Sequence, residues 1–187
     1  MIAAGSPRLH RSSGPESLGE RLRILRVPVL VTDVQDTDLA ASDHEAHRVR
    51  RAIRDAAIDN RVLVETSGSE EIGPLDPRVH VIMDLKCPGS GEMKRNRWEN
   101  LEHLDGGDEV KFVILDRADY EWACDVVRER GLDRRVRDGT LRAILFSPVW
   151  DALDRQELAE WILEDGLPVR FQTQLHKHIW DPMRKGA

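Results

Sequence analysis

The stretch from Val62 to Leu101 decides the fold, because it holds two short apolar runs that each end in a polar, glycine-containing turn. The first run, Val62–Val64, continues into E-T-S-G-S, and the second, Val79–Leu85, continues into K-C-P-G-S-G-E. Ligands bind at the carboxyl ends of parallel strands, where such turns lie. The stretch therefore predicts polar ligand contacts at or just after the ends of two strands, drawn from Glu65, Thr66, Ser69, Asp84, Lys86, Ser90 and Glu92.

Outward from this stretch, apolar runs alternate with segments of helical period, which predicts an α/β fold with a largely parallel sheet. Strands are expected at 26–32, 62–64, 79–85, 109–115, 141–146 and 168–173, and helices at 43–58, 96–104, 116–130 and 154–164. Six strands are too few to close an eight-stranded barrel of ~250 residues. We therefore expect a partial, open barrel in a single domain that spans residues 21–187.

Composition narrows the class of protein. Residues 1–20 are rich in Ser, Gly, Pro and Arg without an apolar period, which predicts a disordered leader. The formal net charge is −6, so no overall basic field favours nucleic acid as a partner. No apolar run approaches the ~20 residues that span a bilayer, and the first residues lack the apolar core of a secretory signal. We expect a cytoplasmic protein with neither a nucleic-acid nor a membrane partner.

The chain has two cysteines, Cys87 and Cys124. We expect no disulfide in a cytosolic chain. Cys124 lies in the predicted helix D-Y-E-W-A-C-D-V-V-R, where a small core residue is the simplest interpretation. Two isolated cysteines cannot hold an iron–sulfur cluster, which needs several closely spaced thiolates. We therefore expect no metal centre on this chain.

Polar side chains also accompany the later predicted strands. Lys111 lies near the start of strand 109–115, Ser147 follows strand 141–146, and His176 and Lys177 follow the last strand. Each alone is better explained as a cap or a solvated turn, but together they shift the balance modestly toward a pocket. If the chain stays extended beyond the last strand, alternation places His176 and His178 on one side and Lys177 on the other. Two histidines would bind a metal only with a third ligand, and the sequence offers no obvious one.

Several motifs resemble the family of 7-carboxy-7-deazaguanine synthase, a radical S-adenosylmethionine enzyme of queuosine and other 7-deazapurine biosynthesis. They are M-D-L-K-C-P-G-S-G-E, N-R-W-E-N-L, D-E-V-K-F-V-I and L-H-K-H-I-W, and they fall between about Arg61 and Ala187. The resemblance implies a carbon–nitrogen lyase on a partial TIM barrel that contracts the ring of 6-carboxy-5,6,7,8-tetrahydropterin to 7-carboxy-7-deazaguanine. It also implies S-adenosylmethionine, a [4Fe–4S] cluster and magnesium as cofactors, and a homodimer.

The resemblance assigns roles to particular residues. Those that it places at the S-adenosylmethionine site are Glu65, Thr66, Ser69, Asp84, Lys86, Lys111 and Ser147. Lys86 is the best single candidate among them. His176 and Lys177 would contact the pterin or deazapurine ligand. No catalytic residue is assigned.

The front of the chain departs from the family. The family's three-cysteine motif has no counterpart, and its G-G-E-P turn is replaced by D-V-Q-D at 33–36, after Val29–Thr32. Three interpretations stay open. The chain is a homologue that is truncated or degenerate and inactive unless a partner chain supplies the cluster. Alternatively, it is a non-catalytic binding protein that keeps the pocket for S-adenosylmethionine or a deazapurine, or a structural interaction module.

Overall fold

The computed structural model describes residues 29–33, 51, 55 and 61–179. These residues build a six-stranded sheet in which every neighbouring pair is parallel and the strand order follows the chain. The strands are β1 (Val29–Asp33), β2 (Arg61–Thr66), β3 (His80–Leu85), β4 (Glu109–Ile114), β5 (Ala143–Pro148) and β6 (Arg170–Phe171). The predicted parallel α/β sheet is confirmed, strand by strand. Within the described residues β1 and β6 are its two edges, so this part of the sheet is open.

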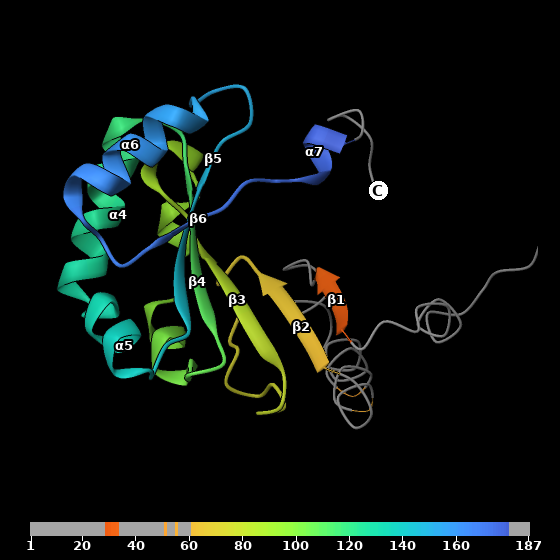
Figure 1. Cartoon of the computed structure of the whole chain (residues 1–187). Coiled ribbons are helices and arrows are strands. Elements are labelled where there is room, and N and C mark those ends of the chain that lie inside the picture. Colours follow the sequence, from red (N-terminus) through yellow and green to blue (C-terminus); the bar gives the residue numbers. More distant parts are fainter. Residues whose placement is uncertain (1–28, 34–50, 52–54, 56–60, 180–187) are drawn as a thin grey trace, which may run out of the picture.

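Three α-helices cover one side of the sheet, and a single helical turn lies on the other (Figure 1). The covering helices are α4 (Arg117–Glu129), α5 (Leu132–Asp138) and α6 (Arg155–Asp165), and the separate turn is α7 (His176–Ile179). Three short 3₁₀ segments follow β3, namely η1 (Pro88–Ser90), η2 (Met93–Arg95) and η3 (Trp98–His103). Asp116 and Asp154 cap α4 and α6 by accepting backbone N–H groups of the first turn. The expected helices 116–130 and 154–164 are thereby confirmed.

The two faces of the sheet differ because successive strand residues point to opposite sides. Paired residues in neighbouring parallel strands share a face, so the register builds rows across the sheet. The rows on the helix-covered face are buried and apolar, and they comprise Met83, Val110 and Ile144, then Leu85, Phe112 and Phe146. We call the other side the open face, and its rows carry Glu65, Ile82 and Glu109, then Asp84, Lys111, Leu145 and Arg170.

Aromatic rings tie the helices to the covered face. Phe112 packs edge-on against Phe146 with ring centroids 5.4 Å apart, and Tyr120 of α4 packs against Phe146 at 5.8 Å. Trp122 reaches Phe112 from the same helix at 6.2 Å. These aromatic residues of the helices therefore serve packing. Cys124 is also buried in this layer, as the helical pattern predicts.

Two local features differ from expectation. The helix α5 has no counterpart among the predicted helices, because only Leu132 of its residues is buried and the rest show no apolar period. The chain beyond β6 is also not extended, since His176–Ile179 forms the helical turn α7. The alternation expected for this segment assumed an extended chain and is therefore wrong, because the backbone is helical there.

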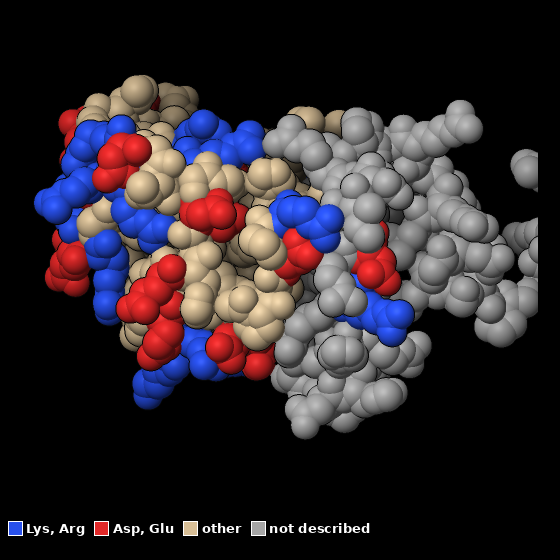
Figure 2. Space-filling model, turned by 90° about the horizontal axis from the view of Figure 1, so that it is seen from below, with Lys and Arg blue, Asp and Glu red and all other residues tan. Residues whose placement is uncertain are grey.

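Some expectations fall on residues that the structure does not describe. The leader at 1–20 lies outside the described residues, and of the expected helix 43–58 only Arg51 and Asp55 are described, both helical. In the described part of the chain, no helix combines the length and the apolar character needed to cross a bilayer. At the amino ends of the strands, acidic and basic side chains are interspersed on the surface, as Figure 2 shows.

Candidate functional site

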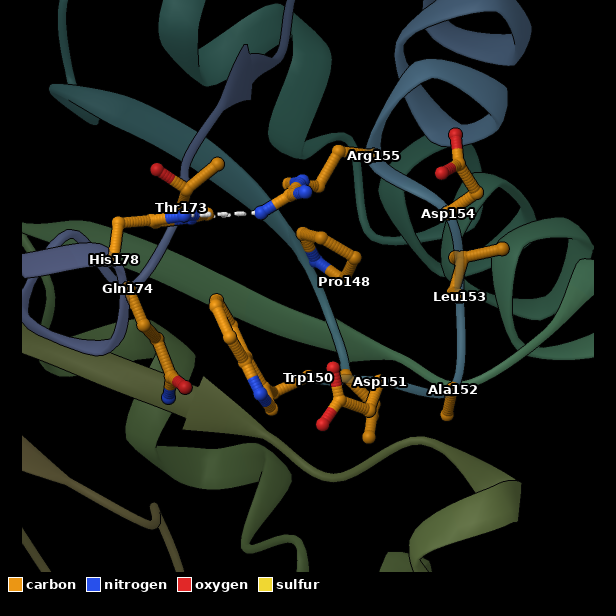
Figure 3. A pocket seen from close by; sticks show the side chains of 11 residues that line it. Pro148, Trp150, Asp151, Ala152, Leu153, Asp154, Arg155, Thr173, Gln174 and His178 are labelled. Carbon is orange, nitrogen blue, oxygen red and sulfur yellow. Dashed lines mark hydrogen bonds between the residues drawn. The ribbon is translucent and has the colours of Figure 1, made fainter. Parts of the chain in front are cut away.

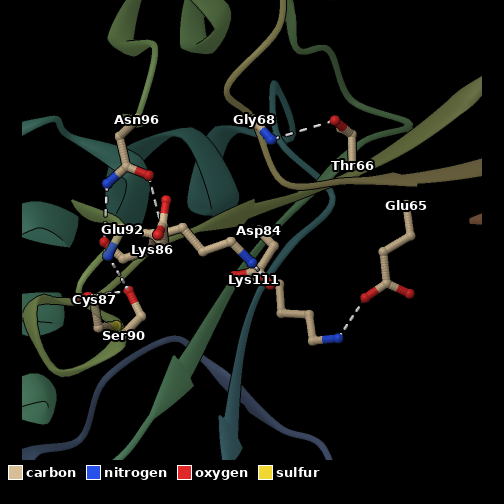
Figure 4. A network of polar contacts seen from close by, with 10 residues as sticks. All are labelled: Glu65, Thr66, Gly68, Asp84, Lys86, Cys87, Ser90, Glu92, Asn96 and Lys111. Carbon is tan, nitrogen blue, oxygen red and sulfur yellow. Dashed lines mark hydrogen bonds and ion pairs between the residues drawn. The ribbon is translucent and has the colours of Figure 1, made fainter. Parts of the chain in front are cut away.

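The carboxyl edge of the sheet brings together Asp84 and Lys86 from the end of β3 (Figure 4). Lys86 Nζ lies 2.8 Å from Asp84 Oδ2, and the lysine side chain keeps 29% of its surface exposed. The second carboxylate oxygen, Asp84 Oδ1, is buried and has no hydrogen-bond partner within the described residues. A buried carboxylate oxygen is costly to leave unpaired. The pair therefore offers a ligand one cation and one vacant acceptor side by side.

A second ion pair lies on the open face beside the first. Lys111 of β4 is the register neighbour of Asp84, and its Nζ lies 2.5 Å from Glu65 Oε1 of β2. The Lys111 side chain is 11% exposed, whereas that of Glu65 is 36% exposed. Four of the side chains predicted from the sequence thus form two neighbouring lysine–carboxylate pairs. The charges in this group balance.

Two asparagines hold the loops that follow β2 and β3. Asn96 Oδ1 accepts the Lys86 N–H at 2.9 Å, and Asn96 Nδ2 donates to the Lys86 carbonyl at 2.9 Å. Asn100 Oδ1 accepts the Ile72 N–H, while its Nδ2 donates to the carbonyls of Gly68 and Glu70. We call Asn96 and Asn100 the asparagine clasp. Sequence reasoning missed this function, because both asparagines bond to backbone groups that lie 10 to 32 residues away in the chain.

The loop after β3 is also fixed from α4. Asp119 accepts the Gly89 N–H at 2.8 Å through Oδ1 and the Leu115 N–H at 3.1 Å through Oδ2. A Cβ atom at Gly89 would lie 2.7 Å from Asp119 Oδ2, so only glycine lets this backbone approach so closely. Asp119 is 2% exposed and was not predicted as a site residue. Its signal in the sequence is hidden, because an acidic residue in the first turn of a helix is common.

Two cavities adjoin each other along this edge and share Val149 in their walls. The first, of about 420 Å³, lies between the loop after β3 and the ends of β4 and β5, and Asp84, Lys86, Cys87 and Asp119 line it. The second, of about 280 Å³, lies between the β5–α6 loop and the segment after β6 (Figure 3). We call these the β3 cavity and the β5 cavity.

The β5 cavity combines aromatic rings with cations. Trp150 packs edge-on against His178 with ring centroids 4.8 Å apart, and Arg155 Nη1 contacts the His178 ring at 3.0 Å. Arg155 Cζ and Lys177 Nζ each lie 5.7 Å from the centre of the Trp150 ring. Among the described residues, those that line the cavity include Arg155 and the carboxylates of Asp151 and Asp154, so it suits a flat ligand with one anionic group that faces the arginine.

Other unpaired polar atoms gather near this edge. Trp150 Nε1, Gln172 Oε1 and Ser69 Oγ are buried without a hydrogen-bond partner among the described residues. Buried polar atoms in native proteins are nearly always bonded to protein, water or ligand. Trp150 follows β5, Gln172 follows β6 and Ser69 follows β2, so these atoms lie after three different strands. Their position favours a ligand site over isolated packing defects.

The remaining predicted residues are placed as follows. Thr66 is 2% exposed on the helix-covered face, where its Oγ1 accepts the Gly68 N–H at 3.3 Å. Ser147 is 1% exposed and shares the open face with its register neighbour Val113. Lys177 lies in α7 next to Trp150. His176 begins the same turn. None of Glu65, Thr66, Ser69, Lys111, Ser147 or Lys177 is among the described residues that line the two cavities, so their roles as ligand contacts stay predictions.

The residues present do not fit a [4Fe–4S] cluster. The whole sequence has two cysteines, and no group of three potential ligands lies together within the residues that the structure covers. Cys87 is 1% exposed, and burial, followed by the nearby carboxylates of Asp119 and Asp84, raises the pKa of its thiol. Burial also raises the pKa of Cys124. Two buried cysteines, one after β3 and one in α4, fall short of the several closely spaced thiolates that bind a cluster.

No family model matches the chain, but several curated proteins are similar to it in sequence. The 7-carboxy-7-deazaguanine synthase of Koribacter versatilis is 44% identical over 139 residues, which cover 68% of this chain and 59% of that protein. The enzyme of the same name from Chlorobaculum tepidum is 41% identical over 67% of this chain and 56% of its own length. A third, from Methanospirillum hungatei, is 31% identical over 85% of this chain and 62% of its own length.

The matches extend over most of this chain but not over most of each relative. The chain spans between about half and two thirds of the length of these three curated relatives. An identity of 44% over 139 residues is far above the level at which chance similarity is a concern. The resemblance drawn from the motifs is thereby confirmed. Over some two thirds of its length, this chain is a homologue of the 7-carboxy-7-deazaguanine synthases.

Proposed function

We propose that this chain keeps the ligand-binding side of a 7-carboxy-7-deazaguanine synthase and binds two small molecules at the carboxyl edge of its sheet. S-Adenosylmethionine occupies the β3 cavity, and a pterin or 7-deazapurine that carries a carboxylate occupies the β5 cavity. The scaffold is a partial, open barrel of the radical-SAM type. The chain alone does not carry out the family's ring contraction, since the residues described above cannot seat the cluster.

The adjoining cavities carry this proposal. Lys86 offers a cation to the carboxylate of S-adenosylmethionine, while Asp84 Oδ1 is a vacant acceptor for its amino group or a ribose hydroxyl. Val149 lines both cavities, so the two ligands would lie on either side of this residue. Trp150 supplies a face for a flat ring, and Arg155 supplies a partner for its carboxylate. Volumes of about 280 and 420 Å³ are of the order of small-molecule sites.

In the family, the cluster and S-adenosylmethionine together supply a radical that starts the reaction. This chain's own residues bind and orient the ligands and shield them from water. Two cysteines, both buried, cannot replace three thiolates. In this proposal a partner chain brings the cluster, and these residues by themselves bind the ligands. No group of three or more His, Cys, Asp or Glu side chains lies together among the residues that the structure describes.

Isothermal titration of the purified chain with S-adenosylmethionine tests the β3 cavity. We expect one molecule bound per chain, and Lys86→Ala should weaken binding by about 1.5–3 kcal/mol, as for a charged hydrogen bond. Lys94→Ala is the matched control, because Lys94 is exposed in η2 and does not line the cavity. Absence of binding by the unaltered chain would refute the proposal. Equal affinity of the Lys86 and Lys94 variants would remove Lys86 from the site.

Iron and acid-labile sulfide, measured after anaerobic reconstitution, test the second part. We expect neither to be retained in stoichiometric amount on the isolated chain. Retention of four irons per chain would show that the chain binds a cluster by ligands that the sequence does not suggest. A titration with 6-carboxy-5,6,7,8-tetrahydropterin then tests the β5 cavity, with Arg155→Ala expected to weaken binding and Arg128→Ala, an exposed arginine of α4, as its control.

A further inference from the structure

The asparagine clasp joins the two loops that carry the candidate site. Asn96 forms a closed pair with the backbone N–H and carbonyl of Lys86, the residue whose ammonium group lines the β3 cavity. Asn100 bonds to the backbone of the loop 68–72, which contains Ser69 with its unpaired hydroxyl. One segment of five residues therefore sets the position of both loops.

Only a side-chain amide can both accept and donate these hydrogen bonds. Asn96 accepts one hydrogen bond and donates another to the same residue, and Asn100 accepts one and donates two. An aspartate would accept but not donate, and an aliphatic residue would do neither. Asn100 is fully buried and Asn96 is 8% exposed, so water cannot easily replace their bonds. Loss of either side chain would leave backbone groups unpaired.

The segment that carries the asparagine clasp also contacts the helix layer. Trp98 lies between the two asparagines, and Arg130 Cζ sits 4.4 Å from the centre of its ring. Trp122 of α4 packs against Trp98 at 6.4 Å. Arg135 of α5 donates to the carbonyl of Leu101 at 2.8 Å. The segment that carries the clasp is thus anchored to α4 and α5 as well as to the loops.

We propose that Asn96 and Asn100 are positioning residues of the ligand site, which hold the Lys86 and Ser69 loops in one arrangement that is competent to bind before the ligand arrives. This inference rests on the proposed function for the identity of the ligand. It goes beyond that function by assigning affinity to residues that line neither cavity within the described part of the chain. Preorganisation of this kind raises affinity by lowering the cost of ordering the loop on binding.

A double-mutant cycle separates positioning from general stability. Asn96→Ala should weaken S-adenosylmethionine about tenfold, the equivalent of roughly one hydrogen bond. In the Lys86→Ala background the same change should weaken it by less than about twofold, because the ammonium that Asn96 positions is gone. Asp108→Ala is the matched control. Asp108 is buried and accepts two backbone N–H groups at the amino ends of the strands, away from the cavities. It should lower the melting temperature without altering affinity.

A second measurement needs no ligand. Hydrogen exchange should show the Lys86 N–H exchanging at least about tenfold faster in Asn96→Ala, and the Ile72 N–H likewise in Asn100→Ala, as expected when a buried hydrogen bond is lost. Acylation of Lys86 by an amine-reactive reagent, measured against Lys94, should rise in Asn96→Ala but not in Asp108→Ala. These readouts report the loop and the ammonium group directly.

The outcomes separate this inference from the proposed function. If the unaltered chain does not bind S-adenosylmethionine, the proposed function fails, and exchange and acylation decide on the clasp alone. If it binds, and the Asn96 effect is additive with that of Lys86, the asparagine acts through stability and the inference is overturned. Unchanged exchange and acylation in Asn96→Ala would overturn it as well.

Discussion

The two faces of this sheet are built from the same strands but carry different kinds of side chain. On the covered face, the row Leu85–Phe112–Phe146 is fully buried beneath helices. One residue earlier in each strand, the row Asp84–Lys111–Leu145 mixes a carboxylate and an ammonium group with a leucine. Leu145 is buried but lies outside the main hydrophobic cluster, which confirms that the faces are separate. A shift of one residue in register would exchange the two.

The difference teaches where stability and function reside. The covered face excludes water and supplies most of the free energy of folding through apolar burial. The open face accepts costly buried charges, which are retained only in pairs such as Lys111–Glu65 and Asp84–Lys86. If this division is correct, changes on the covered face should alter stability alone. Changes on the open face should alter binding and leave stability largely intact.

The largest expected effect is on the covered face. Phe146→Ala removes a ring that contacts Phe112 and Tyr120, and it should lower the free energy of unfolding by about 3–5 kcal/mol, as for other buried phenylalanines. Urea denaturation followed by tryptophan fluorescence measures this. Phe146→Leu, which keeps most of the volume, should cost much less. If Phe146→Ala costs less than about 1 kcal/mol, the covered face is not the stabilising core.

The fold was largely predictable because its signals are local. The strands at Val62–Val64 and Val79–Leu85 are short apolar runs, and the helix that begins after Asp116 has a cap, a period and Gly131 at its end. The helix α5 was not predictable in this way, since it follows Gly131 at once and buries only Leu132. The turn α7 was misjudged for a similar reason. A single helical turn has no period to detect.

The site was predictable only in part. Asp84 and Lys86 follow from a strand end and its polar turn, and the structure brings them together at one cavity. Pairing of Lys111 with Glu65 depends on register between strands 46 residues apart in the chain, which no local pattern contains. Asn96, Asn100 and Asp119 act by bonding to backbone groups of distant loops. Such functions become visible only when the loops are placed in space.

The second largest effect is expected on the open face, and it concerns affinity for the ligand. The double variant Lys111→Met with Glu65→Gln removes an ion pair whose lysine is largely buried. Replacing such a pair by neutral groups is often neutral or stabilising, so the free energy of unfolding should stay within about 1 kcal/mol of the original or rise. Affinity for S-adenosylmethionine should fall about tenfold if these charges contact the ligand, as the loss of one charged hydrogen bond would produce. Titration and urea denaturation of the same preparation measure both.

Two results for this double variant would contradict the proposed division between the two faces of the sheet. A loss of several kcal/mol in stability would mean that the open face is also a structural core. An unchanged affinity would mean that the ligand contacts are confined to the β3 cavity, with Lys86 and Asp84. The single variant Lys111→Met serves as the control, because it leaves the Glu65 carboxylate without its ammonium partner and should be less stable than the double variant.

The smallest effect is expected at the amino end of the open face. Glu109 Oε1 forms ion pairs with Arg142 Nε at 3.3 Å and Arg170 Nη1 at 3.7 Å, and the two arginine side chains are 48% and 61% exposed. Ion pairs this accessible to water contribute little, so Glu109→Gln should lower the free energy of unfolding by less than about 1 kcal/mol. The loss should shrink further at high salt, because screening already weakens the pair. Affinity for S-adenosylmethionine should not change, since Glu109 begins β4 and the cavities lie at the opposite ends of the strands. A clear loss of affinity in Glu109→Gln would show that residues along the whole open face contribute to binding. Binding would then be a property of the open face as a whole and not only of the carboxyl ends of its strands.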